Sequence, residues 1–572
     1  MPTEKKITGY PSIDKPWLKY HIKKSVDFDV NATLYNNFKR VANQSLNELA
    51  IINYRTCKKT TFSELLSKID EFANGLTAFG ISKTDKIVAL TFNSFIDPIA
   101  VLGANKIGAV IEFLDPDSDI AQLQRHTENA KMLLVEGIFQ PLARLICNNI
   151  PVVVYNSSAL MPEDNYIAYN EFIKKGTKVT SEVNDDVSLP AIIIFSSGST
   201  GAPKPIVHSN FSVNSAILKM MMADFPLSPS NMMAKTIPSY IGLGVVTSML
   251  VAIMSGMPYI QVSTIEEGTI DLGNCTPDAI PVFLVSEALD LFVNYINWLK
   301  DNNLKNYGLI IFAAPIFFKA LLAQEKIITD MSFLKAILLG GSKMSNEELA
   351  LMEKVFGAKG LSVPIGIGYG QNELCGAVAL NTVNYNKNGS AGYPVFETNI
   401  KIVDRDTYEE VKYNQEGLIL EQSDSSFIYY DNMPEETKKT KIILPDGSVW
   451  YNSNDLGYMD EDGFIFITGR TNRVVIKTDL KISMDVVEMK IKEFAGILDV
   501  AVVPYANGTE PGDTIAFVVI DKSVRETVTV QDFASELSFA ETPVKVVVLN
   551  ELPRMNNGKV DYRALEKEAE KL

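Results

Sequence analysis

The stretch from Ile192 to Lys204 is the strongest constraint on how this chain folds and what it binds. The apolar run Ala191–Phe195 predicts a buried strand, which leads into eight residues that are almost all hydroxyl-bearing, glycine or proline. Gly198 and Gly201 let backbone N–H groups approach an anion closely, and Lys204 adds a compact positive charge. The hydroxyl donors are Ser196, Ser197, Ser199 and Thr200. The run departs from the common G-x-x-x-x-G-K-[ST] pattern, because only two residues separate its glycines. It predicts a loop that wraps a polyphosphate, with a flexible Ser/Gly turn as the alternative.

The length and the charge of the chain bound its function. With 572 residues it is too long for a single core, and roughly three to four domain-sized units are expected. A composition of 46% apolar and 21% charged residues is typical of a soluble globular protein. The net charge of −16 argues against a nucleic-acid-binding surface and against attraction to an anionic bilayer. We therefore expect a small-molecule partner and no nucleic acid.

The cysteines and histidines predict a reduced, cytoplasmic protein without a zinc site. The four cysteines are Cys57, Cys147, Cys275 and Cys375, and no two of them form a C-x-x-C pair. The three histidines are too scattered to suggest a metal cluster. No apolar segment after the N-terminus resembles a secretory signal.

The uncharged segment Thr236–Ile265 could be mistaken for a membrane span. Glycine, serine and proline residues interrupt it. We therefore expect a buried helix at Val245–Met254 and a strand at Tyr259–Val262, and no membrane span.

Helix and strand patterns alternate along most of the chain. Residues 1–32 form an arm that we expect to be extended and docked on the body. From Thr33 onward, short connections join strands and helices, which predicts an α/β fold with a parallel sheet covered on both faces. The same rhythm returns around the predicted phosphate loop and continues to Leu334–Leu339. Short alternating strands from Thr398 indicate a small β-rich unit, and a compact final block follows Gly469-Arg470.

Two short motifs in the second half of the α/β region could face a nucleotide. Gly340-Gly341-Ser342 follows a buried strand, so a flat ring could lie against its backbone; the alternative is a tight turn. In Gly368–Glu373, Tyr369 could stack on a purine and Glu373 could hold Mg²⁺ beside phosphates. The alternative for this second motif is a glycine-rich loop with an exposed glutamate.

Three further motifs lie nearer the C-terminus. Asp455, within Asn452–Gly457, could accept both hydroxyls of a ribose, although such a polar run also forms Asx turns. Arg470 could bind ribose or phosphate, but a single arginine in a turn indicates little by itself. Lys559 lies on the Pro/Asn/Gly-rich loop Leu552–Asp561, where a solvated surface lysine is the alternative.

The order and the spacing of these motifs resemble the adenylate-forming superfamily. This superfamily includes acyl- and aryl-CoA synthetases, adenylation domains of peptide synthetases and beetle luciferase. The matching features are the loop Ser196–Lys204, the Tyr-Gly-x-x-Glu motif at Tyr369, Asp455, the Gly-Arg pair ending at Arg470, and the Pro-x-x-x-x-Gly-Lys ending at Lys559. The resemblance implies a large region, residues 1–471, with two parallel-type α/β subdomains and a small β-rich subdomain. A small mobile α+β domain, residues 472–572, follows.

The resemblance also implies a two-step reaction and a role for each motif. A carboxylate attacks the α-phosphate of Mg-ATP to give acyl-AMP, and a thiol of coenzyme A or of a carrier-protein pantetheine then displaces AMP. Catalytic roles fall to Lys559, Lys204 and Glu373, magnesium to Thr200 and Glu373, and the hinge to Asn472. The implied nucleotide-binding residues are Ser196, Ser197, Gly198, Ser199, Thr200, Gly201, Lys204, Gly340, Gly341, Ser342, Tyr369, Gly370, Asp455 and Arg470.

Three departures from the family pattern qualify these roles. Asn372 replaces the usual Thr or Ser before the magnesium glutamate, and we expect its amide to keep the hydrogen bonding. The ribose motif reads Asn-Ser-Asn-Asp but keeps Asp455. No glycine occurs between Gly469 and Gly496, where the family has one beside the pantetheine tunnel. Adenylation is therefore better supported than thioester formation.

The expected acid pocket is apolar. Tyr240, Ile241 and Gly242 occupy the segment where amino-acid-activating members hold an aspartate, and no acidic residue occurs from Thr236 to Ile265. An unpaired ammonium in such a pocket would cost several kcal/mol. The prediction is a fatty or aryl acid without an α-amino group, unless these residues are simply core.

Three activities remain open at this point. The chain could be an acyl-CoA synthetase, a stand-alone adenylation enzyme that loads a separate carrier protein, or a degenerate adenylate-binding protein. Luciferase-like oxidation is compatible with the fold but has no positive feature in the sequence.

Overall fold

The computed structural model describes most of the chain from residue 7 to residue 572. The residues outside the description are 1–6, 22–23, 117, 148, 157–163, 197–202, 263–278, 342–343, 478–479, 506, 509–511, 535 and 555–559, and only the backbone is described for 279–287.

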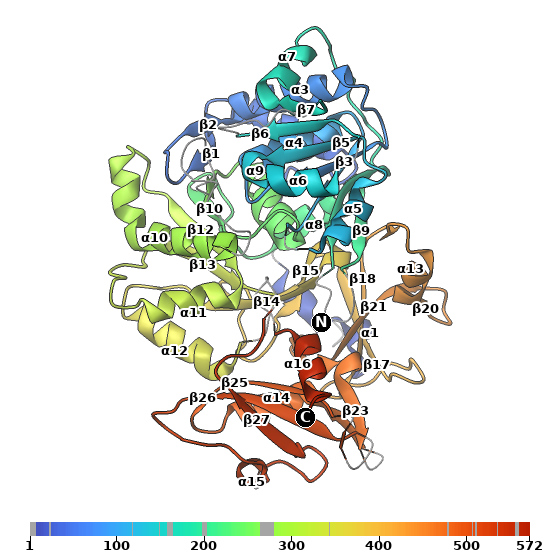
Figure 1. Ribbon diagram of the computed structural model, residues 1–572, viewed down its shortest axis with the longest axis vertical. Helices are drawn as coiled ribbons and strands as arrows, with labels where there is room; N and C mark the ends of the chain where they lie inside the picture. The colour runs from blue at the N-terminus through green and yellow to red at the C-terminus, as the bar shows by residue number, and fades with distance from the viewer. Residues whose placement is uncertain are drawn as a thin grey trace, which may run out of the picture.

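The first α/β subdomain contains an eight-stranded sheet in the order β19-β9-β8-β4-β3-β5-β6-β7. Its parallel strands are β3 (Lys86–Leu90), β4 (Val110–Phe113), β5 (Met132–Glu136), β6 (Val152–Tyr155), β7 (Tyr166–Ala168) and β8 (Pro190–Phe195). The antiparallel strands at its edge are β9 (Pro205–Ser209) and β19 (Tyr429–Tyr430). Its helices are α3 (Phe62–Ala78), α4 (Ile96–Lys106), α5 (Ile120–Thr127), α6 (Gln140–Ile146) and α7 (Tyr169–Gly176). The strands are almost entirely apolar because helices cover both faces (Figure 1).

The second α/β subdomain contains a nine-stranded sheet in the order β16-β15-β14-β13-β12-β10-β11-β1-β2. Its strands are β1 (Leu49–Asn53), β2 (Lys59–Thr61), β10 (Asn231–Lys235), β11 (Tyr259–Gln261), β12 (Gly308–Ala313), β13 (Leu334–Leu339), β14 (Ile365–Gln371), β15 (Gly376–Leu380) and β16 (Tyr393–Pro394). The neighbouring helices are α2 (Leu34–Gln44), α8 (Asn210–Met222), α9 (Val251–Met254), α10 (Ala279–Asp301), α11 (Pro315–Ala323) and α12 (Asn346–Gly357).

The uncharged segment forms a buried helix and a strand, as predicted. A π-helical stretch, Leu243–Leu250, continues directly into α9, and β11 follows. Among the described residues, every helix is too short or too polar to cross a membrane.

A β-rich subdomain and a final α+β block complete the molecule. The β-rich subdomain contains β17 (Thr398–Val403), β18 (Gly417–Ser423), β20 (Lys441–Ile443), β21 (Val449–Met459), β22 (Ile465–Arg470) and α13 (Pro434–Thr440). The final block contains the hairpin β23 (Val474–Lys477) and β24 (Leu480–Ser483), the sheet β25 (Ile497–Pro504), β26 (Thr514–Ile520) and β27 (Lys545–Leu549), and the helices α14 (Met484–Lys492), α15 (Val530–Phe533) and α16 (Tyr562–Ala569). This block lies below the large region in Figure 1. The predicted α/β fold class is confirmed.

The N-terminal arm is helical over Pro11–Asp14 and Pro16–Tyr20, so the expectation of an extended chain was wrong for this part of it. Pro11 begins α1 (Pro11–Asp14) and Pro16 begins a 3-10 helix, Pro16–Tyr20, because a proline at the first helical position loses no hydrogen bond. The arm is docked as expected. Trp17 is fully buried, and the backbone N–H of Ser12 donates to Glu410 Oε1 at 2.8 Å.

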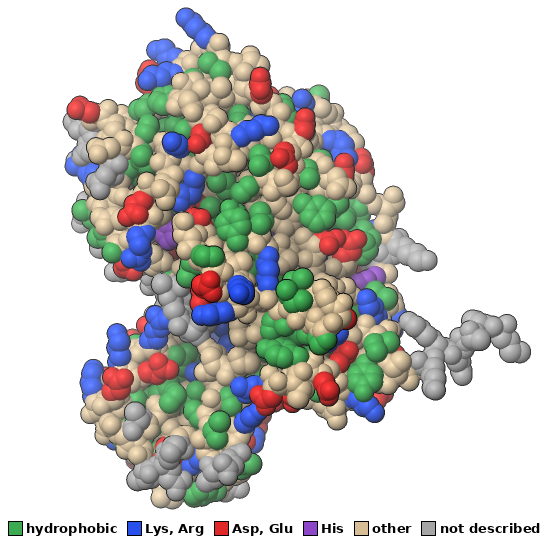
Figure 2. Space-filling model, turned by 90° about the vertical axis from the view of Figure 1, so that its right-hand side faces the viewer, with side chains coloured by type: hydrophobic (Ala, Val, Ile, Leu, Met, Phe, Trp, Pro, Cys, Tyr) green, Lys and Arg blue, Asp and Glu red, His purple; other side chains and the backbone are tan. Residues whose placement is uncertain are grey.

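Acidic and basic side chains are interspersed with hydrophobic ones on the face shown in Figure 2.

The topology brings several predicted motifs to strand ends. Ser196 follows β8, Gly340 follows β13, and Tyr369 lies near the end of β14. The carboxyl ends of parallel strands meet at one edge of an open sheet, which is where such sheets bind ligands.

Candidate active site

Asn372 joins three of the predicted motifs. Its Nδ2 donates to the carbonyl of Phe195 at the end of β8, and its Oδ1 accepts from the backbone N–H of Gly242 at 3.2 Å. Its carbonyl lies 2.7 Å from Nε2 of His208. Burial lowers the pKa of His208 to about 4, so this imidazole is neutral at pH 7. The amide at Asn372 therefore makes the hydrogen bonds that we expected it to keep, and it connects the phosphate-loop strand to the acid-pocket segment.

Glu373 is buried and not an exposed loop carboxylate. Its side chain is part of a residue that is 8% exposed, and the Tyr430 hydroxyl donates to Glu373 Oε1 at 2.9 Å. Burial raises the pKa of the Glu373 carboxyl above its ordinary value, although the Tyr430 hydrogen bond and the charge of Lys204 oppose this shift. The backbone N–H of Phe427 donates to the Glu373 carbonyl at 2.7 Å, and this bond holds the backbone of Glu373 in place.

This carboxylate fits a magnesium site that is completed by phosphate oxygens. Among the described residues, no group of three or more His, Cys, Asp or Glu side chains could hold a metal. Mg²⁺, however, is usually bound by one or two carboxylates together with substrate phosphates and water. A buried carboxylate with a raised pKa gains from such a cation, because the cation stabilises its ionised form.

The two described ends of the predicted phosphate loop are paired with each other. The backbone N–H of Lys204 donates to Ser196 Oγ at 2.9 Å, and the Ser196 N–H donates to the Lys204 carbonyl at 3.0 Å. The Lys204 ammonium lies 2.7 Å from Glu436 Oε2 and 5.0 Å from the ring centroid of Tyr430. Lys204, Tyr430 and Glu373 are therefore neighbours. The predicted residues Ser197, Gly198, Ser199, Thr200, Gly201, Ser342 and Lys559 lie outside the described residues.

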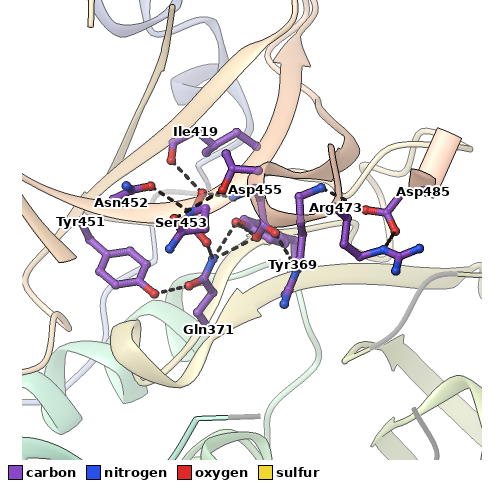
Figure 3. A network of polar contacts seen from close by, with 12 residues as sticks. Tyr369, Gln371, Ile419, Tyr451, Asn452, Ser453, Asp455, Arg473 and Asp485 are labelled. Atoms are coloured by element: carbon purple, nitrogen blue, oxygen red, sulfur yellow. Dashed lines mark hydrogen bonds and ion pairs between the residues drawn. The ribbon is translucent and has the colours of Figure 1, made fainter. Parts of the chain in front are cut away.

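A second cluster contains the predicted ribose residues. The antiparallel pairing of β21 with β22 places Asp455 opposite Arg470, and Arg470 Nε lies 3.0 Å from Asp455 Oδ1. The Tyr369 hydroxyl donates to Asp455 Oδ2 at 2.7 Å (Figure 3). Asp455 is 2% exposed and lies within a strand; the run also makes the Asx-type hydrogen bond of the alternative interpretation, because Asn452 Oδ1 accepts from the Asn454 N–H at 2.9 Å.

Gln371 and Tyr451 are site residues that the sequence reasoning missed. Gln371 Nε2 donates to Asp455 Oδ2 and to the Tyr369 hydroxyl, both at 3.0 Å, and the Tyr451 hydroxyl donates to Gln371 Oε1 (Figure 3). Tyr451 and Asp455 lie on either side of an irregularity in β21, where the register against β18 shifts and Asn454 has a φ of 58°. Simple strand alternation therefore does not explain why both contact Gln371. Gln371 lies inside the Tyr-Gly-x-x-Glu motif, but nothing local indicated its partner.

Glu421 was also missed. It lies opposite Tyr451 in the β18–β21 pair and is fully buried. Burial raises the pKa of its carboxyl well above the ordinary value, and the charges of Asp455 and Glu373 act in the same direction. The cluster around Asp455 therefore contains a carboxyl group that favours its neutral form.

Gly340 and Gly341 leave an open backbone beside β14. A Cβ at Gly340 would lie 3.5 Å from the Gly368 carbonyl, and Gly341 has a φ of +88° with nothing near an added Cβ. The conformation of Gly341 favours glycine. Gly370, after Tyr369, could not carry a side chain, because its Cβ would lie 1.9 Å from the Gly376 carbonyl.

The predicted acid-pocket segment presents mostly apolar side chains. Tyr240 is half-buried and packs between two core clusters, while Ile241 is half-buried beside it. A Cβ at Gly242 would come within 2.9 Å of Asn372 Oδ1. Beside this segment, Asp97 accepts from Ser239 Oγ at 2.5 Å and pairs with the buried Lys235 at 3.2 Å.

The predicted hinge residue, Asn472, lies between two anchored arginines. It is exposed, and no residue of its 3-10 turn, Thr471–Arg473, is buried. On one side, the Arg470 N–H donates to Asp485 Oδ2 at 3.0 Å. On the other side, Arg473 Nε donates to Asp485 Oδ1 at 2.7 Å (Figure 3). The Arg473 guanidinium also lies 3.7 Å from the ring centroid of Tyr562.

The fold and this pair of clusters define an adenylate-forming enzyme. A lysine and a buried carboxylate form one end of the site, and an aspartate–arginine–tyrosine cluster forms the other. The family model of the AMP-binding enzymes matches residues 38–276 and 299–430. The chain therefore belongs to this family.

Similar proteins cover nearly the whole chain. YdaB of Bacillus subtilis, provisionally named an acyl-CoA ligase, is 27% identical over 528 residues, which span 89% of this chain and 94% of YdaB. A 4-coumarate–CoA ligase-like protein of Oryza sativa subsp. japonica is 26% identical over 90% of this chain and 88% of its own length. The structure of ATP-bound MatB from Rhodopseudomonas palustris matches with a TM-score of 0.76, at 20% identity, over 94% of this chain and 99% of MatB. This last likeness concerns the fold.

Proposed function

We propose that this protein is an AMP-forming acid–thiol ligase that activates a hydrophobic carboxylic acid with ATP. The main observation behind the proposal is that two clusters of polar residues lie next to each other, one beside Asn372 and the other beside Gln371. Lys204 and Glu373 suit the polyphosphate and its magnesium, while Asp455, Arg470 and Tyr369 suit the nucleoside. The CoA-ligase names of the relatives support this activity.

The chemistry needs positive charge and hydrogen-bond donors where the phosphate oxygens gain charge. Lys204 supplies an ammonium immediately before β9, and the predicted loop Ser196–Gly201 supplies donors. Glu373, together with Thr200, would hold magnesium, which neutralises phosphate charge when bound. Asp455 accepts the ribose hydroxyls and Arg470 orients Asp455 through their 3.0 Å contact. Tyr369 and the open backbone of Gly340-Gly341 flank the base. Lys559 joins the carboxylate to the α-phosphate.

The acid lacks an α-amino group. An ammonium beside Tyr240 and Ile241 would need a free carboxylate, and Asp97 is already neutralised by Lys235. Leaving that ammonium unpaired in an apolar pocket costs several kcal/mol. We therefore propose a fatty or aryl acid as the substrate.

The thiol acceptor is coenzyme A or a carrier-protein pantetheine, and the second step requires a mobile C-terminal domain. We propose that the domain boundary lies between residues 471 and 472, with Asn472 as the pivot. Rotation there would break the bond from the Arg470 N–H to Asp485, which crosses the boundary, whereas Arg473 and Asp485 would move together. Loading of a separate carrier protein is the alternative acceptor chemistry. A degenerate adenylate binder would have no reason to keep Lys204, Glu373, Asp455 and Arg470 together. A cytoplasmic location remains a prediction.

Pyrophosphate release tests the proposed function. Purified protein is incubated with Mg-ATP and a panel of fatty, aryl and amino acids, with and without coenzyme A. We expect pyrophosphate release with at least one hydrophobic acid and a thioester when coenzyme A is present. Release without a thioester would favour carrier loading. If no acid in the panel releases pyrophosphate, the enzyme proposal fails.

A further inference from the structure

Lys204 has an acidic partner at the position where the polyphosphate is proposed to bind. Its ammonium lies 2.7 Å from Glu436 Oε2, although 232 residues separate the two in sequence. Glu436 lies in the first turn of α13, a helix that contacts β19 and β20. The Tyr430 ring lies against the same ammonium, with its centroid 5.0 Å away.

The pair is accessible enough to exchange partners. The side chains of Lys204 and Glu436 are 30% and 34% exposed, and ion pairs at such exposure contribute little to stability. Glu436 also has a second partner, because Lys439 Nζ lies 3.1 Å from its other oxygen, Oε1. If Lys204 moves toward another anion, Glu436 keeps a cation beside it. The hydrogen bond from Lys204 lowers the pKa of Glu436, so its carboxylate is ionised at pH 7.

We propose that Glu436 is a placeholder anion for Lys204, which it neutralises in the nucleotide-free protein and gives up to the distal phosphates of ATP. The inference rests on the proposed function, because it assumes that Lys204 meets the polyphosphate. A carboxylate and a phosphate oxygen compete for the same ammonium, so ATP must displace Glu436 from Lys204 before it can use that charge. Glu436 therefore weakens ATP binding and shields the lysine while the site is empty.

If Glu436 instead positioned Lys204, removing its carboxylate would change the affinity for ATP in the opposite direction. If Glu436 held Lys204 in its productive orientation, removing the carboxylate would loosen the lysine and weaken ATP binding. The sign of the change in affinity therefore separates the two roles.

The test compares Glu436→Gln with Glu435→Gln by calorimetric titration of Mg-ATP and of AMP. Glu435 is an exposed residue of the same helix turn, so its substitution makes the same change in net charge without touching Lys204. We expect Glu436→Gln to bind Mg-ATP about fivefold more tightly than wild type, which corresponds to about 1 kcal/mol. AMP, which lacks the distal phosphates, should bind with unchanged affinity. Glu435→Gln should resemble wild type with both ligands.

A Lys204→Met background provides the second measurement. Because the placeholder acts through Lys204, adding Glu436→Gln in this background should change Mg-ATP affinity by less than twofold. Weaker or unchanged Mg-ATP binding by the single variant Glu436→Gln, or equal gains for Mg-ATP and AMP, would overturn the inference. If wild-type protein binds no Mg-ATP, the proposed function fails and this inference fails with it. Normal wild-type binding with no gain in the variant overturns the inference alone.

Discussion

The hydrogen bond from Tyr430 to Glu373 provides a direct test of the proposed magnesium site. The Tyr430 hydroxyl donates at 2.9 Å to a carboxylate whose residue is 8% exposed. Tyr430→Phe removes this donor but keeps the ring that lies against Lys204. A hydrogen bond to a charged group contributes about 1.5–3 kcal/mol. Losing it should therefore disfavour the ionised form of Glu373 by about tenfold or more, in the same direction as the existing burial effect on its pKa.

Magnesium needs the ionised carboxylate, so the effect should depend on pH. We expect Tyr430→Phe to lower the affinity for ATP in the presence of Mg²⁺ by up to about tenfold where Glu373 is protonated, so the loss should be larger at about pH 6 than at about pH 9. Calorimetric titration at both pH values measures this difference. Tyr429→Phe is the control, because Tyr429 is the neighbouring residue and is 40% exposed. An affinity equal to wild type at both pH values, or an equal loss at both, would refute the assignment of Glu373.

Three other predictions follow from single residues. Gln371→Leu removes a 3.0 Å hydrogen bond to Asp455, so the preference for ATP over deoxy-ATP should fall about threefold to tenfold in competition binding, and an unchanged preference would contradict the role. Lys559→Ala should abolish acid-dependent pyrophosphate release and leave ATP binding within about twofold of wild type; strong loss of ATP binding would mean that its role is misplaced. Burial raises the pKa of Glu136 to about 8, so the folded state binds a proton that the unfolded chain releases at lower pH, and stability falls as pH rises from about 4 to 8. Glu136→Gln, which cannot ionise, should therefore match wild type in urea unfolding at pH 5 and exceed it at pH 9; the same difference at both pH values would exclude titration of Glu136.

Much of the α/β architecture could be predicted because its strands are buried on both faces. Runs such as Ala191–Phe195 and Leu334–Leu339 are almost continuously apolar, which local composition reveals. The motifs that follow them have distinctive spacing, so the residues Lys204 and Glu373 could be named without coordinates. The N-terminal arm was misjudged because prolines were taken as signs of extended chain, whereas Pro11 and Pro16 each begin a helical turn.

The contacts that complete the site could not be predicted, because they join residues distant in sequence. Glu436 reaches Lys204 only because β19 pairs with β9 at the edge of the first sheet and α13 follows β19. Gln371 meets Asp455 and Tyr451 only because β14 ends beside β21. Asp97 reaches Ser239 across two subdomains. In each case the local sequence indicates a polar residue but not its partner.

ATP–pyrophosphate exchange with a matched pair of acids is the measurement that tests the central claim most directly. Phenylpropanoate and phenylalanine differ only in the α-ammonium group, so they separate the two classes of acid within one assay. Aryl and fatty acids are each offered beside the amino acid that has the same side chain. The proposed pocket predicts exchange only with the acids that lack the ammonium group. Exchange with phenylalanine and not with phenylpropanoate, or with no acid of either class, would contradict the account.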